Sequence, residues 1–327
     1  MNINIHRYKD IARLHIEATQ MCQALCPMCD RVDTNGEESR KITNATLTIK
    51  DYKHLFKPNF IKQLKRIRFS GNLGDPMLSP HLISALKYFK KHNSNVKIKV
   101  ETNGGARDKK FWTDLAQYAD EVQFAIDGLE DTNHIYRRRV VWYNIVKNVK
   151  TFVEAGGYGT WVMLIFDHNE HQIEECRKLA SDWGLKEFYI KSTTRSEWNK
   201  STNIQNPYKI DISITEQRLH DVIPLCKETK QIFVDALGNI YPCSWIPGVN
   251  WSLHPLQFDM RLDMMREMKN HNINALQSSL KEVVNGSWFD SFERRWNMDI
   301  PYMCSKYCNA KTERGKHAYS ANVIENV

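Results

Sequence analysis

The chain has 327 residues, of which 42% are hydrophobic and 26% are charged. This composition excludes a disordered or collagen-like chain. Lys and Arg number 46 against 38 Asp and Glu, an excess of eight that does not by itself indicate nucleic-acid binding. The length suits either two domains or one α/β barrel with an appendage.

The N-terminal segment has no basic stretch followed by an apolar one, so we expect no secretory signal. No window is apolar over the length that a transmembrane helix needs, so we expect no membrane association. The sequence therefore predicts a cytoplasmic protein. In that reducing compartment, clustered cysteines are expected to be metal ligands or catalytic groups rather than disulfides.

Short apolar runs alternate with helical patterns between residues 11 and 193. Near-continuous or β-branched runs are typical of strands that are buried on both faces of a parallel sheet. A repeat of about 30 residues suits βαβ units. The expected strands are Ala12–Ala18, Arg66–Ser70, Val96–Glu101, Glu121–Ile126, Thr160–Phe166 and Glu187–Lys191.

Between these runs, apolar residues recur at helical spacing. Asn169 is the expected N-cap of the last helix and Gly184 its C′ residue. Six such units predict an α/β fold in which residues 1–193 form a partial (β/α)6 TIM-like barrel, open rather than closed. The expected helices are His81–Asn93, Lys110–Ala119, Tyr143–Ala155 and His171–Trp183.

The pattern changes after residue 193. Residues 194–221 are polar and aperiodic, which predicts a linker or lid. Residues 222–327 are expected to form a small α+β domain that opens with a hairpin turning at Leu237-Gly238-Asn239. Its expected helices are Met260–Lys269, Ile273–Val284 and Ser287–Trp296.

Cys22, Cys26 and Cys29 directly follow the first expected strand. Structural zinc sites and iron–sulfur clusters both usually take four protein ligands. Three cysteines on a [4Fe–4S] cluster would leave one iron open, and an open position is where a metal site binds a reactant. Chemistry in barrel folds collects at the carboxyl ends of strands, so spacing and position favour a catalytic site. A structural zinc loop is the alternative.

The C-x3-C-x2-C spacing of these cysteines resembles the signature of the radical S-adenosylmethionine (SAM) enzymes. The resemblance implies that the open iron of a [4Fe–4S] cluster binds SAM. One electron then cleaves SAM to methionine and a 5′-deoxyadenosyl radical, which abstracts a hydrogen atom from the substrate.

Other strand ends carry further elements of this resemblance. Gly74 and Asp75 resemble the family's glycine–glycine–glutamate motif, in which a carboxylate and backbone carbonyls hold the methionyl ammonium. Asn103 is at a position that often faces the SAM ribose or methionine. Asp127 lies in an element similar to the S-I-D-G of the subgroup with auxiliary clusters, and Arg137 is then a candidate for binding the SAM carboxylate. An ordinary turn at Asp75 and a solvated basic face at Arg137 are the alternatives.

A second group of cysteines lies in the last third of the chain: Cys226, Cys243, Cys304 and Cys308. With the hairpin glycine, this group resembles the SPASM/twitch extension of some radical SAM enzymes. Four cysteines suffice for one auxiliary [4Fe–4S] cluster, so a twitch-like domain is expected. A four-cysteine zinc ribbon is the alternative. The eighth cysteine, Cys176, is expected to be a buried apolar residue.

The resemblance implies an enzyme that oxidises or crosslinks a small polar metabolite or a peptide, with the auxiliary cluster accepting an electron. It also implies a flavodoxin- or ferredoxin-type electron donor. Such an acidic donor is expected to dock on the basic side chains of Lys62, Lys65, Arg66 and Arg68, or of Lys90 and Lys91. A solvated helix face is the alternative for each single lysine. The alternative function is a zinc-binding nucleic-acid module without catalysis. The strand-end motifs speak against it because a binding module has no need of them.

Overall fold

The computed structural model describes residues 5–33, 35–39, 42–193, 204, 224–248, 266–298, 300, 301, 304 and 308, and the strand 323–326. Apart from residue 204, the expected linker 194–221 lies outside the described residues. The expected helix Met260–Lys269 is described only from residue 266.

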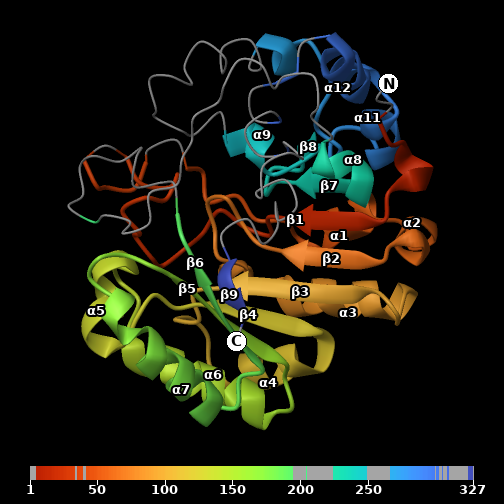
Figure 1. The fold of residues 1–327 in the computed structure, drawn as a ribbon. Coiled ribbons are helices and arrows are strands. Elements are labelled where there is room, and N and C mark those ends of the chain that lie inside the picture. The colour runs from red at the N-terminus through yellow and green to blue at the C-terminus, as the bar shows by residue number, and fades with distance from the viewer. Residues whose placement is uncertain are drawn as a thin grey trace.

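The described strands form one nine-stranded sheet with the order β8-β7-β1-β2-β3-β4-β5-β6-β9 (Figure 1). Neighbouring strands from β1 to β6 are parallel, and β8 and β9 each have only one neighbour. The sheet is therefore an open α/β barrel, as the sequence predicts. The six strands of the barrel are β1 (Arg13–Ile16), β2 (Arg66–Phe69), β3 (Lys97–Thr102), β4 (Glu121–Ala125), β5 (Gly159–Leu164) and β6 (Glu187–Lys191).

Helices pack on one face of this sheet. In Figure 1, α1 and α3 lie along β1, β2 and β3, while α4, α6 and α7 cover the strands that follow. No described helix combines the length and apolarity that crossing a membrane requires. The helices of this layer are α1 (Ile49–Leu55), α2 (Pro58–Gln63), α3 (Leu82–His92), α4 (Lys109–Tyr118), α5 (Glu130–Tyr136), α6 (Trp142–Glu154) and α7 (Ile173–Asp182).

The two faces of the barrel strands differ in chemistry. In β2, Ile67 and Phe69 are fully buried whereas Arg68 between them is partly exposed. Strand β3 alternates in the same way, so the apolar residues of both strands face the helices and the charged ones face the concave interior. Burial of the apolar face against the helices is the main stabilising contribution to the barrel.

The C-terminal region extends the same sheet. Strand β7 (Gln231–Val234) pairs in parallel with β1 and forms the expected hairpin with β8 (Ile240–Tyr241). Within the turn, Asp235 accepts backbone hydrogen bonds from Leu237 and Asn239, and Gly238 has a φ of +83°. At the other edge, β9 (Val323–Asn326) pairs antiparallel with β6. The helices of this region are α8 (Leu225–Thr229), α9 (Trp245–Gly248), α11 (Leu280–Val284) and α12 (Ser287–Met298).

Two local predictions are wrong. The expected helix Ile273–Val284 forms only as α11, because the Asn274 side chain accepts backbone hydrogen bonds from Leu276 and Gln277 and makes a turn there. Asn169 does not cap α7, which begins after Gln172. The expected C′ residue of this helix, Gly184, does have the left-handed conformation, with a φ of +77°.

Candidate active site

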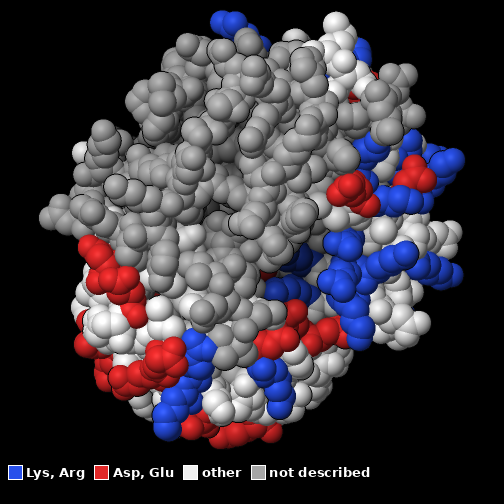
Figure 2. All heavy atoms as spheres, viewed as in Figure 1, with Lys and Arg blue, Asp and Glu red and all other residues white. Residues whose placement is uncertain are grey.

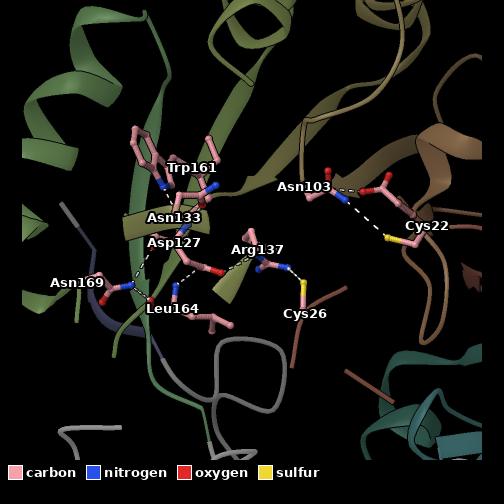
Figure 3. A network of polar contacts seen from close by, with 11 residues as sticks. Cys22, Cys26, Asn103, Asp127, Asn133, Arg137, Trp161, Leu164 and Asn169 are labelled. Atoms are coloured by element: carbon pink, nitrogen blue, oxygen red, sulfur yellow. Dashed lines mark hydrogen bonds and ion pairs between the residues drawn. The ribbon is translucent and has the colours of Figure 1, made fainter. Parts of the chain in front are cut away.

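The first three cysteines lie in the loop after β1, at the carboxyl edge of the sheet. Two other strand ends supply nitrogen donors to their sulfurs (Figure 3). The Asn103 Nδ2 atom, after β3, is 3.8 Å from Cys22 Sγ, and Arg137 Nη1, after β4 and α5, is 3.8 Å from Cys26 Sγ. The structure thus brings two of the predicted polar residues against two of the three cysteines.

These thiols fit a bound cluster. Burial raises the pKa of the Cys22 thiol, and the neighbouring Asp75, Cys26 and Cys29 raise it further. A raised pKa favours the protonated thiol, whereas a bound metal holds cysteine as thiolate. N–H donors directed at the sulfurs, as from Asn103 and Arg137, stabilise metal-bound thiolates and tune the metal.

Among the residues that the structure describes, no three His, Cys, Asp or Glu side chains converge on a site for one metal ion. A single zinc ion holds its thiolates at about 2.3 Å. A four-iron cluster is larger and keeps its ligands further apart.

Asp75 organises the end of β3. Its buried carboxylate accepts hydrogen bonds from Thr102 Oγ1 at 2.9 Å and from the backbone nitrogens of Asn103 and Met77 at 2.8 and 2.9 Å. Burial raises the pKa of Asp75, although these hydrogen bonds oppose the shift. The carboxylate therefore fixes the backbone from which Asn103 reaches Cys22.

The loop that carries Asp75 is itself packed against the end of β1. A Cβ atom on Gly74 would lie 1.8 Å from the Thr19 carbonyl oxygen, so only glycine fits there. Glu17, buried at the end of β1, accepts a 2.7 Å hydrogen bond from the Leu73 nitrogen. Burial raises the pKa of Glu17 to about 7. Glu17 thus holds the 71–75 loop, a role that no sequence motif indicates.

Asp127 and Arg137 form a buried ion pair. Arg137 Nε is 2.6 Å from Asp127 Oδ2, and the Asp127 side chain is fully buried. Burial raises the pKa of Asp127, although Arg137 and the Leu164 nitrogen oppose the shift. Burial alone would lower the pKa of Arg137, but Asp127 and Cys26 raise it overall. The pair therefore keeps a guanidinium beside the sulfur of Cys26.

Three uncharged residues hold these groups in place. Asn133 accepts a hydrogen bond from the Asp127 nitrogen at 2.8 Å, and Asn169 donates to the Asp127 carbonyl at 3.1 Å. Gln23 donates to Asn103 Oδ1 at 2.6 Å, which leaves the Asn103 nitrogen to face Cys22. Gln23 lies inside the cysteine motif and Asn169 follows the fifth expected strand, so their positions indicated this edge of the sheet, whereas Asn133 had no expected role.

Charged side chains line the concave face of the sheet. Arg68 pairs with Glu101 at 2.6 Å, and Lys99 pairs with Glu121 at 2.7 Å. Figure 2 shows basic and acidic side chains next to one another over β2 and β3. Lys90 is paired with Asp120 at 2.6 Å. Arg68 and Lys90, two residues of the expected donor-docking surface, are thus both paired with carboxylates. Their charges are therefore partly compensated within the chain.

The second group of cysteines is also brought together. Cys226 and Cys304 are buried, and Cys243 and Cys308 are partly buried. Burial raises the pKa of the Cys226 thiol, and Cys243, Cys304 and Cys308 each raise it further, so all four thiols lie within electrostatic reach. Cys176, in α7, is a fully buried core residue.

Comparison with known protein families identifies the family of this chain. The profile of the radical SAM superfamily matches residues 16–180, half of the chain. The chain belongs to the radical SAM superfamily. Members of this superfamily are enzymes, and membership supports a SAM-binding [4Fe–4S] cluster in this chain. No curated protein sequence matched the chain.

Solved radical SAM structures share the fold. SuiB of Streptococcus suis, crystallised with S-adenosylmethionine, is 16% identical with a TM-score of 0.54, over 90% of this chain and 77% of SuiB. SuiB bound to its precursor peptide SuiA gives 16% and 0.55, over 90% and 76%. The protein anSMEcpe with bound AdoMet is 14% identical with a TM-score of 0.54, over 95% of both chains. At these identities, the similarity establishes the fold.

Proposed function

We propose that this chain cleaves SAM reductively at a [4Fe–4S] cluster held by Cys22, Cys26 and Cys29, and that the radical abstracts hydrogen from a small polar metabolite or a peptide. The observation that carries the proposal is the pair of N–H contacts from Asn103 and Arg137 to Cys22 and Cys26. When bound, the cluster supplies the electron that cleaves SAM to methionine and the 5′-deoxyadenosyl radical.

The neighbouring residues have proposed roles toward SAM. Arg137, held at Nε by Asp127, is oriented to present its guanidinium to the SAM carboxylate. Asn103 presents an amide at the mouth of the cysteine loop. Asp75 and Gly74 fix the loop whose backbone carbonyls are proposed to accept from the methionyl ammonium.

Cys226, Cys243, Cys304 and Cys308 are proposed to hold a second [4Fe–4S] cluster in a twitch-like domain of residues 222–327. Two observations support this proposal. The other three thiols lie near enough to Cys226 to raise its pKa, and four cysteines are the number that one cluster takes. This cluster would accept an electron from the substrate radical, giving a net oxidation or crosslink. A peptide substrate is supported by SuiB bound to SuiA and by anSMEcpe bound to the Cp18Cys peptide.

The initial electron is proposed to come from a flavodoxin- or ferredoxin-type protein. The remaining basic residues of the expected docking surface, Lys62, Lys65, Arg66 and Lys91, are the proposed contacts. Charge complementarity with an acidic donor would speed their encounter.

The test is anaerobic reconstitution with iron and sulfide, followed by reduction, addition of SAM and measurement of 5′-deoxyadenosine. Wild type and a Cys176→Ala control are expected to form it, whereas Cys26→Ala forms none. Stoichiometric zinc with no 5′-deoxyadenosine would overturn the proposal in favour of a zinc-binding nucleic-acid module.

A further inference from the structure

Lys191 is a partly buried cation at the carboxyl edge of the barrel. It is the last residue of β6, and its carbonyl accepts a hydrogen bond from the Ile165 nitrogen at 2.9 Å. Leu164, which precedes Ile165 in the chain, donates its backbone N–H to the Asp127 side chain. Only β5 therefore lies between β6, which ends at Lys191, and β4, after which Asp127 follows.

The Lys191 side chain faces the concave interior. Its ammonium interacts electrostatically with Glu101, Arg68, Lys99 and Glu121 on β2, β3 and β4. In the sheet, β6 is separated from β4 by β5 and from β2 by three strands. An interaction between these strands passes through the interior of the barrel, because the outer face is covered by helices.

The described charges around Lys191 include no counter-ion that pairs with it alone. The four charged side chains that interact with its ammonium already form two ion pairs. Arg68 pairs with Glu101, and Lys99 pairs with Glu121. Glu187, nearer the start of β6, accepts hydrogen bonds from Tyr158 and Tyr189. Within the part of the chain that the structure describes, no hydrogen bond or ion pair is made by the Lys191 ammonium. Among these described charges, one positive charge is left in excess.

A charge that is partly withdrawn from water and has no partner is unfavourable. Burial lowers the pKa of Lys191, although Glu101 opposes the shift. Lys191 ends β6 and the cysteine loop follows β1, so both lie at the carboxyl edge of the sheet, where α/β barrels bind their ligands. A single excess charge matches a monoanion better than a phosphate, which carries close to two negative charges.

We propose that Lys191 binds a carboxylate of the substrate, so that the substrate is a carboxylic acid held inside the barrel. The assignment rests on the proposed function, because it names the substrate class for that same site. Lys191 is then a binding residue that neither the cysteine motif nor the strand-end motifs indicate.

The first test compares the thermal unfolding of two variants of the reconstituted protein. Lys191→Met removes an unpaired charge and keeps the length of the stem, so its unfolding midpoint is expected to equal or exceed that of wild type. Lys99→Met breaks the pair with Glu121 and is expected to lower the midpoint. If Lys191→Met lowers it as much as Lys99→Met, Lys191 is a structural partner and the proposal fails.

The second test measures binding of a carboxylate probe at constant ionic strength. N-acetylglycine is expected to raise the unfolding midpoint of wild type, and its neutral isostere N-acetylglycinamide is not. The shift is expected to vanish in Lys191→Met and to persist in Lys186→Met, a matched change at the exposed start of β6.

Four outcomes would overturn the proposal: no shift with N-acetylglycine, an equal shift with the amide, a shift retained in Lys191→Met, or a larger shift with inorganic phosphate. None of these measurements uses SAM. Failure of the proposed function, seen as absent 5′-deoxyadenosine, is therefore distinguished from failure of the carboxylate site.

Discussion

The Asn72 side chain donates a 2.8 Å hydrogen bond to the carbonyl of Ser244, next to Cys243. The carbonyl of Asn72 itself lies 4.0 Å from Cys29 Sγ. One residue of the loop after β2 thus contacts both the first cysteine group and the segment that carries part of the second. This contact couples the position of residues 243–244 to the loop that holds Asp75.

Asn72→Ala is expected to loosen the segment around Cys243, because it removes the hydrogen bond that ties this segment to the barrel. The loss of one such bond costs about 1 kcal/mol. Amide hydrogen exchange of residues 243–248 is expected to accelerate, while exchange in β3 stays as in wild type. Asn95→Ala, a change at an exposed loop position, is the control. Unchanged exchange at 243–248 would show that the contact does not position this segment.

Asp127→Asn is expected to destabilise the protein strongly, because it leaves the Arg137 guanidinium without its counter-charge. Breaking a buried ion pair costs about 3–5 kcal/mol. Asp114→Asn breaks an exposed pair with Lys110 and is expected to have little effect. Urea unfolding measures both. Equal midpoints for the two variants would show that the Asp127–Arg137 pair does not stabilise the fold more than an exposed pair does.

Glu17 predicts a particular dependence of stability on pH. Its pKa of about 7 in the folded protein is above its ordinary value of 4.5, because of burial and the neighbouring Asp235. Between these two values the folded state holds the proton more tightly than the unfolded state does. The contribution of this group to stability is therefore complete below about pH 4.5 and is lost as the pH rises through about 7.

The free energy of unfolding at pH 5 and pH 7.5 tests this dependence. The decrease from the lower to the higher pH is expected to be smaller in Glu17→Gln than in wild type. Glu154→Gln, at an exposed helix end, is expected to retain the wild-type decrease. If Glu17→Gln retains it too, Glu17 does not titrate as its burial implies.

Much of the barrel was predictable because its signals are local. Each expected strand overlaps an observed one, and Glu187–Lys191 coincides with β6. Hydrophobic runs and turn residues determine such elements over a few positions. The failed helix at residue 273 shows the limit of periodicity, since one asparagine side chain outweighs the helical spacing there.

The contacts that complete the site were not predictable, because they join distant residues. Asn133 had no expected role and Asn169 was expected to cap a helix, yet both hold Asp127. The parallel pairing of β7 with β1 brings together residues more than 200 positions apart, and no local pattern specifies it. The charged interior did have a visible pattern in R-I-R-F and K-I-K-V-E-T, of which we attributed only Arg66 and Arg68 to a role, as part of a docking surface.

The two cysteine groups predict separable iron contents. Reconstituted wild type is expected to contain about eight irons per chain. Cys26→Ala and Cys243→Ala are each expected to lose about four, and Cys176→Ala none, because Cys176 lies in the core of the helix layer. Iron and sulfide analysis measures this. A Cys243→Ala protein that keeps all its iron would contradict a cluster at the second group.

Binding of SAM to the first cluster is the central claim, and electron paramagnetic resonance of the reduced Cys243→Ala variant tests it most directly. With the second group disrupted, the spectrum is expected to report on the cluster of Cys22, Cys26 and Cys29 alone. Addition of SAM is expected to shift its g-values, because SAM binds the iron that lacks a cysteine. A spectrum that is identical with and without SAM would contradict the account.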